Sequence, residues 1–285
     1  MKVLVTGNNG KFVKYLKSYA SKNKRDWEFD FISLRTDSWR QVDMSSYDAV
    51  FHCAGITSAP GDDYKMFKKI NVTLTEELFR QAIEQRAKQF VYLSSMAVYD
   101  GVGWGFGKEG LITLDTEPRQ KTNYGKSKYE AEKAIKAEMA GNTKVSIIRA
   151  PSIVGGGMEA YFARYVKFAR IPFIPIPVIH EEAKRSFVYV DTLIEFVCNI
   201  IQNTAEGVFF PQQYPPLSVS EMMSVVCEAM GKPKIKSKIV GRIIPGAIQN
   251  RFFSQICYDS KLNENENRMV PYISSKEAII HAINE

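Results

Sequence analysis

Tyr124 and Lys128 form the pair of side chains in this sequence that is best suited to move a proton. They open a stretch, residues 124–140, in which apolar residues recur at helical spacing. Residues four apart on a helix share a face, with Cβ atoms about 5–6 Å apart. A free tyrosine has a pKa of about 10, and a neighbouring positive charge lowers that pKa by favouring the phenolate. The pair therefore predicts an acid/base tyrosine, although the spacing alone is more often that of a half-buried aromatic residue and a solvated lysine.

The amino-terminal residues predict a phosphate-binding turn. A short apolar run, residues 2–6, is followed by Gly7 and Gly10 and then by a helical pattern. Such a turn brings backbone N–H groups and a helix amino terminus up to a phosphate. Val13 stands where a third glycine usually allows close packing, which indicates a wider contact between helix and strand. Glycine turns after strands are common, so this turn does not establish a nucleotide site by itself.

The end of the second predicted strand, residues 29–34, indicates which dinucleotide would bind. In dinucleotide folds an acidic residue here takes the ribose 2′-hydroxyl, whereas an arginine accommodates a 2′-phosphate. Arg35 therefore predicts NADP, with NAD as the alternative, unless it is only a surface arginine. Asp43, just before the third predicted strand at residues 47–52, is placed to hold the adenine amino group.

Strands and helices alternate along the first half of the chain. A long helix, residues 66–86 with Asn71 partway along, precedes a fourth strand at residues 89–94 that delivers Ser94 and Ser95 at its end. The alternation predicts an α/β fold with a doubly wound parallel sheet of the Rossmann type, and ligands at the carboxyl ends of the strands. A glycine-rich stretch, residues 100–110, is either a lid or a surface loop.

The regular pattern ends near Pro151, which predicts a smaller, discontinuous carboxyl-terminal substrate domain. We expect the dinucleotide-binding domain to comprise residues 1–150 plus about 184–210, and the substrate domain to comprise about 151–183 plus 211–285. Residues 232–251 alternate basic and apolar side chains, as in a membrane-surface helix. The solvated face of a small terminal domain is the interpretation we favour for that segment.

Composition and charge narrow the possible partners. The chain has 285 residues, a 45% hydrophobic fraction and a formal net charge of +7. The basic residues are dispersed along the sequence, which favours an anionic small molecule over a nucleic acid. The four cysteines show no metal-ligand spacing and are expected to be buried thiols. No apolar run is long enough to span a membrane and no signal peptide is evident, so we expect a cytoplasmic protein without membrane insertion.

Six motifs occur in the order found in extended short-chain dehydrogenase/reductases, and the chain resembles the branch of that family that contains nucleotide-sugar epimerases, dehydratases and 4-reductases. The resemblance extends from the first strand to about Asp191, with a fainter match at residues 258–262. The motifs are Thr6-Gly7-x-x-Gly10, His52-Cys53-Ala54-Gly55, Ser94-Ser95-Met96-Ala97-Val98-Tyr99, Tyr124-x-x-x-Lys128, Arg149-Ala150-Pro151-Ser152-Ile153-Val154-Gly155 and Arg185-Ser186-Phe187-Val188-Tyr189-Val190-Asp191.

The resemblance assigns roles to individual residues. It implies that Ser95 hydrogen-bonds the substrate oxygen, that Tyr124 is the acid/base, and that Lys128 binds the nicotinamide ribose and lowers the pKa of the tyrosine. The cofactor-binding set that it implies is Thr6, Gly7, Asn9, Gly10, Lys11, Phe12, Arg35, Asp43, Ala54, Gly55, Asn71, Tyr124, Lys128 and Pro151. The corresponding substrate-binding set is Ser95, Met96, Ser152, Arg185 and Arg251.

The function that follows is NADPH-dependent reduction of a 4-keto nucleotide sugar in polysaccharide precursor synthesis. A UDP-sugar 4-epimerase that retains its NAD is the alternative, although Ser152 replaces the asparagine of many such epimerases. A dehydratase is disfavoured because Met96 and Ala97 stand where dehydratases carry an acidic pair. A non-catalytic NADP-binding redox sensor is the alternative of another class, and Tyr124 and Lys128 argue against it. The expected partner is a nucleoside-diphosphate sugar, and a homodimer is left open.

Overall fold

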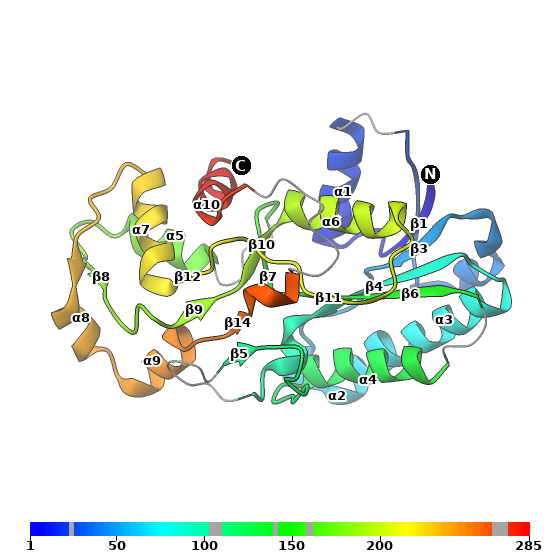
Figure 1. Ribbon diagram of the computed structural model, residues 1–285, viewed down its shortest axis with the longest axis horizontal. Coiled ribbons are helices and arrows are strands. Elements are labelled where there is room, and N and C mark those ends of the chain that lie inside the picture. Colours follow the sequence, from blue (N-terminus) through cyan, green and yellow to red (C-terminus); the bar gives the residue numbers. More distant parts are fainter. Residues whose placement is uncertain (23–25, 103–109, 139–141, 158–161, 264–272) are drawn as a thin grey trace. The chain divides into compact units, whose positions relative to one another are not determined.

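The computed structural model describes residues 1–22, 26–102, 110–138, 142–157, 162–263 and 273–285 (Figure 1). These residues form two compact units. The first unit comprises residues 1–101, 118–150 and 194–210, and the second comprises residues 102–117, 151–193 and 211–285. Most of the glycine-rich stretch, residues 103–109, lies outside the described residues.

A six-stranded parallel sheet forms the centre of the first unit, in the order β11-β6-β4-β3-β1-β2. Its strands are β1 (Lys2–Thr6), β2 (Glu28–Ile32), β3 (Ala49–His52), β4 (Gln89–Ser95), β6 (Lys144–Ala150) and β11 (Gly207–Phe209). Residues facing both sides of β1, β3 and β4 are buried, as expected for strands covered on both faces. The predicted α/β class and parallel sheet are confirmed.

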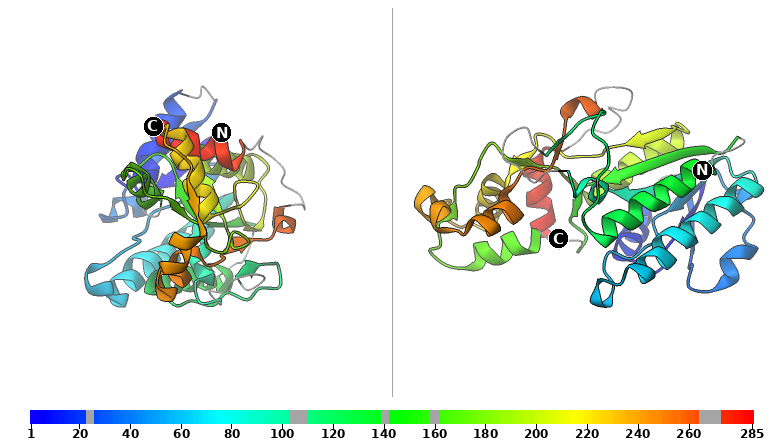
Figure 2. Two further views of the ribbon diagram at one scale, coloured as in Figure 1. Left: turned by 90° about the vertical axis from the view of Figure 1, so that its left-hand side faces the viewer. Right: turned by 90° about the horizontal axis from the view of Figure 1, so that it is seen from below.

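Helices cover both faces of this sheet. Figure 1 shows α1 and α6 on one face, and α3 and α4 on the other; Figure 2 (right) shows α3 and α4 again from the side that they cover. The helices of this unit are α1 (Lys11–Lys22), α2 (Tyr64–Phe67), α3 (Leu74–Glu84), α4 (Asn123–Ala137) and most of α6 (Val190–Gln202). The predicted helix over residues 66–86 is instead α2 and α3, joined by a π-helical segment, Lys68–Thr73.

The core of the first unit joins the sheet to α3 and α4. Its apolar members from the strands include Leu4, Val50 and Phe90, and those from the helices include Leu78 and Ile135. Each such side chain stabilises the fold by about 1.5–3 kcal/mol when it is fully buried. The apolar side chains on one face of α3 and α4 therefore pack against the apolar side chains of the strands in one continuous layer.

A buried ion pair also fastens α4 to the sheet. Arg149 of β6 and Glu132 of α4 are joined by hydrogen bonds of 3.1, 3.2 and 2.6 Å, and the two side chains are 6% and 0% exposed. Ser94 donates to the same carboxylate at 2.5 Å, and Arg149 also donates to the Tyr99 hydroxyl. Both buried charges are hydrogen-bonded within this network. Their contacts therefore offset most of the free-energy cost of removing the two charged groups from water.

The second unit is built from short strand pairs and helices. Its strands are β5 (Leu111–Ile112), β7 (Ser152–Val154), β8 (Ile176–Pro177), β9 (Lys184–Arg185), β10 (Phe187–Tyr189), β12 (Leu217–Ser218), β13 (Lys236–Ser237) and β14 (Cys257–Tyr258). They pair as β10·β7, β12·β9, β13·β8 and β14·β5. Its helices are α5 (Phe162–Arg170), α7 (Val219–Ala229), α8 (Lys238–Ile243), α9 (Gly246–Phe253) and α10 (Ser275–Asn284).

Local sequence explains where two of these helices begin. Ser218 caps α7 and exchanges hydrogen bonds with Glu221, and Ser274 and Glu277 form the same capping box at α10. All four cysteines are free, and three of them are buried, as expected. Within the described ranges, no helix has the length and apolar character needed to cross a membrane.

Candidate active site

Ser95 and Tyr124 meet where β4 ends and α4 begins. The Ser95 side chain lies close enough to the phenol of Tyr124 to influence its pKa. It also accepts a hydrogen bond of 3.1 Å from the backbone N–H of Ala97, which makes Ser95 the cap of a 3₁₀ turn, Met96–Tyr99. Since the Ser95 oxygen accepts from the backbone, its own proton is directed away from the turn and is available to an oxygen beside Tyr124.

A glycine brings these two elements together. A Cβ atom on Gly125 would lie well within 3.0 Å of the Ala97 carbonyl oxygen, and 3.0 Å from an oxygen of Asp100. No other residue type fits there without moving α4 away from the turn after Ser95. The backbone of Gly125 donates to the hydroxyl of Thr122, which caps α4. Asp100 in turn accepts hydrogen bonds from the backbone and hydroxyl of Thr122, so three side-chain contacts hold the start of α4 in place.

Burial sets the proton affinity of both members of the tyrosine–lysine pair. Burial raises the pKa of Tyr124, and the hydrogen bond from Ser95 opposes that rise. Burial and Ser95 are the causes of this shift in the protein alone, so the expected lowering of the pKa by Lys128 stays a prediction. Burial lowers the pKa of Lys128 to about 8, against the opposing influence of Cys53 and Glu132. Both shifts favour the neutral form, because desolvation penalises any charged form.

The ammonium group of Lys128 lies beside the ends of β3 and β4. Its Nζ donates to the Leu93 carbonyl oxygen at 2.9 Å and lies 4.7 Å from the ring centre of Tyr92. It lies 3.6 Å from the position of a Cβ on Gly55. An ammonium has three N–H donors, and the described residues supply one acceptor for it. Lys128 is thus a nearly buried cation with donor capacity directed at the carboxyl edge of the sheet.

Asn71 holds the loop after β3 against the catalytic helix. Its side-chain N–H groups donate to the Ile56 carbonyl and the Ser127 hydroxyl, both at 2.9 Å, and its oxygen accepts from the Ile56 N–H at 2.8 Å. Ser127 donates to the Tyr124 carbonyl at 2.8 Å. Because the amide is engaged in this way, its evident role is to position Gly55 and α4, whereas the resemblance implied a direct contact with the cofactor.

The glycine turn lies against the end of β3, where the direction of winding of the sheet changes. Gly7 has φ +99°, and a Cβ there would lie 3.2 Å from the Cα of Ala54. Gly10 donates to the Gly7 carbonyl at 3.3 Å, and α1 begins at the next residue, Lys11, with no acidic residue in its first turn. The positive end of the helix dipole therefore faces the turn without a carboxylate to neutralise it. Val13 is buried in the core rather than leaving a gap.

A buried chain of hydrogen bonds links the residue before the glycine turn to the ends of neighbouring elements. Thr6 and His52 Nδ1 are 2.7 Å apart, and His52 Nε2 and the Thr75 hydroxyl are 2.8 Å apart. Thr75 donates to the Asn71 carbonyl, and Thr6 accepts from the Ala54 N–H. These directions require a neutral histidine with its proton on Nε2. Burial lowers the pKa of His52 to about 3, which agrees with that state.

The two arginines after β2 differ in their partners. Arg40 is paired with Asp37 at 3.2 Å and Glu77 at 2.7 Å, and it lies over the Trp39 ring. Arg35 is exposed, and no ion pair of Arg35 exists within the described residues. Asp43 accepts hydrogen bonds from the N–H and hydroxyl of Ser45 through one oxygen. Arg35 is therefore the guanidinium that remains for an added anion.

The other predicted site residues occupy varied positions. Asn9 and Lys11 are exposed beside the glycine turn, and Phe12 packs edge-on against Phe51 with ring centres 6.1 Å apart. Met96 is buried immediately after Ser95.

Four further candidates belong to the second unit. Pro151 is buried and Ser152 is exposed on β7. Arg185 of β9 donates to the Ser254 carbonyl at 2.9 Å. Arg251 lies in α9, and its side chain is outside the described set.

Comparison with known proteins identifies the family of the chain. The model of the NAD dependent epimerase/dehydratase family matches residues 4–210. A UDP-glucose 4-epimerase of Vibrio cholerae is 28% identical over 222 residues, which cover 74% of this chain and 66% of the relative. The chain thus spans slightly less than two thirds of the length of that curated relative, and smaller shares of the next two.

Solved structures share the fold over the whole chain. A dTDP-4-dehydrorhamnose reductase of Clostridium acetobutylicum has a TM-score of 0.73 at 18% identity, covering 100% of this chain and 99% of the other. The protein RMD of Pseudomonas aeruginosa, in complex with NADPH, has a TM-score of 0.75 at 17% identity with the same coverage. At these identities the likeness establishes the fold alone.

Gly125→Ala tests whether the close approach of α4 sets the position of Tyr124. We expect hydride-transfer turnover to fall by about 10²-fold or more, because a displacement of about 1 Å misaligns reacting groups. The measurement is kcat, with circular dichroism to confirm folding. Gly246→Ala is the matched control, since a Cβ at Gly246 meets nothing within 4 Å. Unchanged turnover in Gly125→Ala would show that the approach of α4 does not control the site.

Proposed function

The chain belongs to the NAD dependent epimerase/dehydratase family, and we propose that it is an NADPH-dependent reductase of 4-keto nucleotide sugars. The observation that carries the proposal is the convergence of Ser95, Tyr124 and Lys128 at the carboxyl end of β4. Burial raises the pKa of Tyr124 in the protein alone, so the proposal requires the charge of Lys128 to bring this pKa back toward neutral pH, where an acid catalyst works best. The proposed site follows the rule that ligands of open α/β sheets bind at strand carboxyl ends.

The residues present fit a dinucleotide. Gly7 has no room for a side chain, and the amino terminus of α1 offers backbone N–H groups and a positive dipole to a pyrophosphate. Lys128 has donor capacity for ribose hydroxyls, and Gly55 leaves its approach open. Arg35 is the residue we assign to a 2′-phosphate, which makes NADP the preferred cofactor and leaves NAD as the alternative. When bound, the reduced nicotinamide would supply the hydride.

The chain's own residues would handle the proton. Ser95 donates a hydrogen bond to the carbonyl oxygen of the sugar and polarises the carbonyl group. Tyr124 gives its proton to the same oxygen as negative charge develops there. Lys128, once its charge lies near the phenol oxygen, stabilises the resulting phenolate. The tyrosine is therefore the proposed proton donor in the reduction.

The second unit is the part of the chain that we assign to sugar-nucleotide recognition. Arg185 and Ser152 belong to it, together with Arg251. A guanidinium suits a diphosphate because its donors match phosphate oxygens in pairs. We accordingly assign the cofactor to the first unit and recognition of the sugar nucleotide's diphosphate to the second unit.

One observation favours a second candidate, a UDP-sugar 4-epimerase. The Vibrio cholerae relative is named as such an enzyme and matches 74% of this chain. An epimerase would need the same Ser95, Tyr124 and Lys128, with the tyrosine first accepting a proton and then returning it. The intact Tyr124–Lys128 pair would serve either reaction, and it disfavours a non-catalytic NADP sensor.

The proposed function predicts that NADPH is consumed as a substrate. The purified protein should be isolated largely free of nucleotide and should oxidise one NADPH per 4-keto nucleotide sugar reduced, measured by loss of absorbance at the nicotinamide band together with product analysis. It should not interconvert UDP-glucose and UDP-galactose in the absence of reduced cofactor. Appearance of UDP-glucose from UDP-galactose at a comparable rate would show that the protein is an epimerase and would refute the proposed reductase function.

Arg35 predicts the choice of cofactor. NADPH should bind at least about tenfold more tightly than NADH, since a charge-assisted contact is worth about 1.5–3 kcal/mol. Arg35→Asp should reverse that order by removing the cation and adding repulsion. Fluorescence titration of both dinucleotides gives the affinities, and Lys136→Asp, which reverses an exposed charge on α4, is the control. Equal affinities for the two dinucleotides in the unmodified protein would refute the role of Arg35.

A further inference from the structure

Exposed apolar side chains gather in two segments of the second unit, residues 162–178 and 230–250. Seven of the eleven large apolar side chains that are exposed in the described part of the chain belong to them. Phe173 is 96% exposed, and Ile239 and Ile243 are 73% and 74% exposed. Such a concentration of exposed apolar groups on one unit is typical of an interaction surface.

The two segments lie side by side. Strands β8 and β13 pair in parallel, with Ile176 opposite Lys236. The Ile176 N–H donates to the Ile235 carbonyl at 2.7 Å, and a Cβ on Gly241 of α8 would meet the Val178 carbonyl oxygen well within 3.0 Å. Figure 1 shows α8 alongside β8. The chain that leads into β8, residues 170–174, and the chain from residue 232 to 243 together form what we call the basic apolar face.

The positive charge of the protein is concentrated in the same two segments. They contain eight Lys or Arg residues and no Asp or Glu, whereas the whole chain has a net charge of +7. The basic residues that look dispersed along the sequence are therefore brought together by the fold. Lys234 is paired with Glu228 and Lys236 with Glu181. For Lys232, Lys238 and Arg242, the described residues supply no ion-pair partner.

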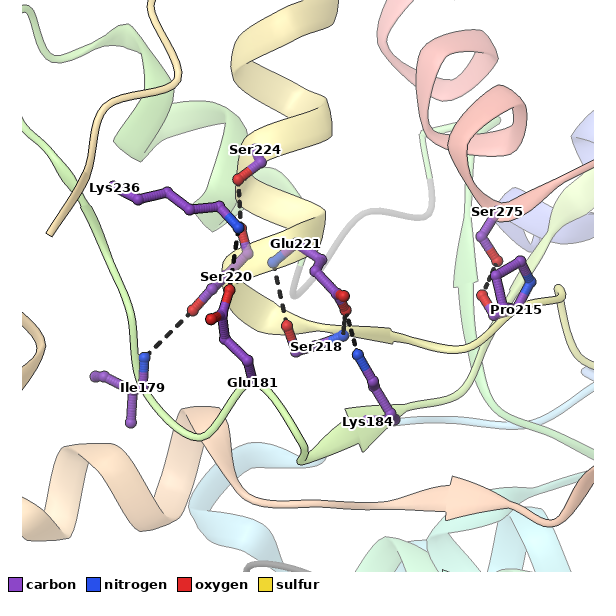
Figure 3. A network of polar contacts seen from close by, with 10 residues as sticks. All are labelled: Ile179, Glu181, Lys184, Pro215, Ser218, Ser220, Glu221, Ser224, Lys236 and Ser275. Atoms are coloured by element: carbon purple, nitrogen blue, oxygen red, sulfur yellow. Dashed lines mark hydrogen bonds and ion pairs between the residues drawn. The ribbon is translucent and has the colours of Figure 1, made fainter. Parts of the chain in front are cut away.

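Hydrogen bonds and an ion pair hold in place the elements that carry the basic apolar face. Ser220 of α7 accepts a hydrogen bond from the Ile179 N–H at 3.4 Å (Figure 3). Ser220 also donates to the Pro177 carbonyl of β8 at 2.7 Å. Lys236 and Glu181, also in Figure 3, join β13 to the chain after β8 at 3.0 Å. Strand β8 is thus tied to both α7 and β13, so the exposed side chains are held on ordered elements.

We propose that the basic apolar face docks the protein on the surface of a membrane rich in anionic phospholipid. Lysines and arginines beside protruding Phe and Ile side chains match an interface whose headgroups are negative and whose acyl boundary is apolar. A phosphate ion or a nucleic acid would use the cations and leave the isoleucines in water. The proposal requires only peripheral binding, and it is independent of the proposed reaction.

The test is co-sedimentation of the full chain with large unilamellar vesicles. We expect strong binding to vesicles of phosphatidylglycerol and phosphatidylcholine, weak binding to pure phosphatidylcholine, and release from the former as salt is raised. This comparison needs no variant. Equal binding to both kinds of vesicle, or no binding to either at low salt, would overturn the proposal.

Two paired variants separate the charge from the apolar contribution. Lys232→Glu with Arg242→Glu should weaken binding about tenfold or more, and Phe173→Ser with Ile239→Ser should also weaken it, while NADPH oxidation stays unchanged in both. Lys69→Glu with Lys136→Glu reverses two exposed charges of the first unit and is the matched control, with binding retained. If the charge variant loses binding and the apolar variant keeps it, the face is a general polyanion site and the membrane proposal fails.

Discussion

The close approach of α4 to the turn after β4 is the constraint on which the site depends. Gly125 allows the helix to lie against the Ala97 carbonyl, and Asp100 and Thr122 hold it there. Below this contact, Glu132 and Arg149 fasten the same helix to β6 through a buried ion pair. Because α4 is fixed both at its start and at Glu132, the position of Tyr124 next to Ser95 does not depend on the conformation of a loop. Preorganisation of this kind is what a proton transfer between positioned groups requires.

Burial then determines which protonation state is favoured for the side chains at this site. It raises the pKa of Tyr124, and it lowers the pKas of Lys128 and His52, so each site side chain is driven toward its neutral form. A lysine with a pKa of about 8 remains mostly protonated at neutral pH, and its positive charge can stabilise a phenolate nearby. Neutral His52 carries the hydrogen bonds from the glycine turn through Thr75 to Asn71, and Asn71 continues them through Ser127 to α4. The cofactor turn and the catalytic helix are thereby parts of one hydrogen-bonded structure.

Sequence alone was enough for the first four strands of the parallel sheet and for the glycine turn, because strand periodicity is a local signal. The pairing of Ser95 with Tyr124 was expected from the family resemblance. It could not reveal the role of Gly125, since a glycine inside a helical pattern looks merely unfavourable until the opposing carbonyl is known. Asn71 was noticed, but its π-helical setting and its bonds to Ile56 and Ser127 depend on tertiary contacts. Spacing reveals a neighbouring charge but not desolvation, and it is burial that raises the pKa of Tyr124 in the protein alone. The basic residues looked scattered because β8 and β13 are far apart along the chain.

The central claim is that Tyr124 supplies the proton in hydride transfer, and the turnover of Tyr124→Phe tests it most directly. The substitution keeps the ring and removes the hydroxyl, so kcat for NADPH-dependent reduction of a 4-keto nucleotide sugar should fall by about 10²–10⁴-fold. NADPH affinity should stay within about twofold, because the ring and Lys128 remain. Tyr129→Phe, which removes a hydroxyl from the same helix, should leave turnover unchanged. A Tyr124→Phe protein that keeps most of its activity would contradict the account.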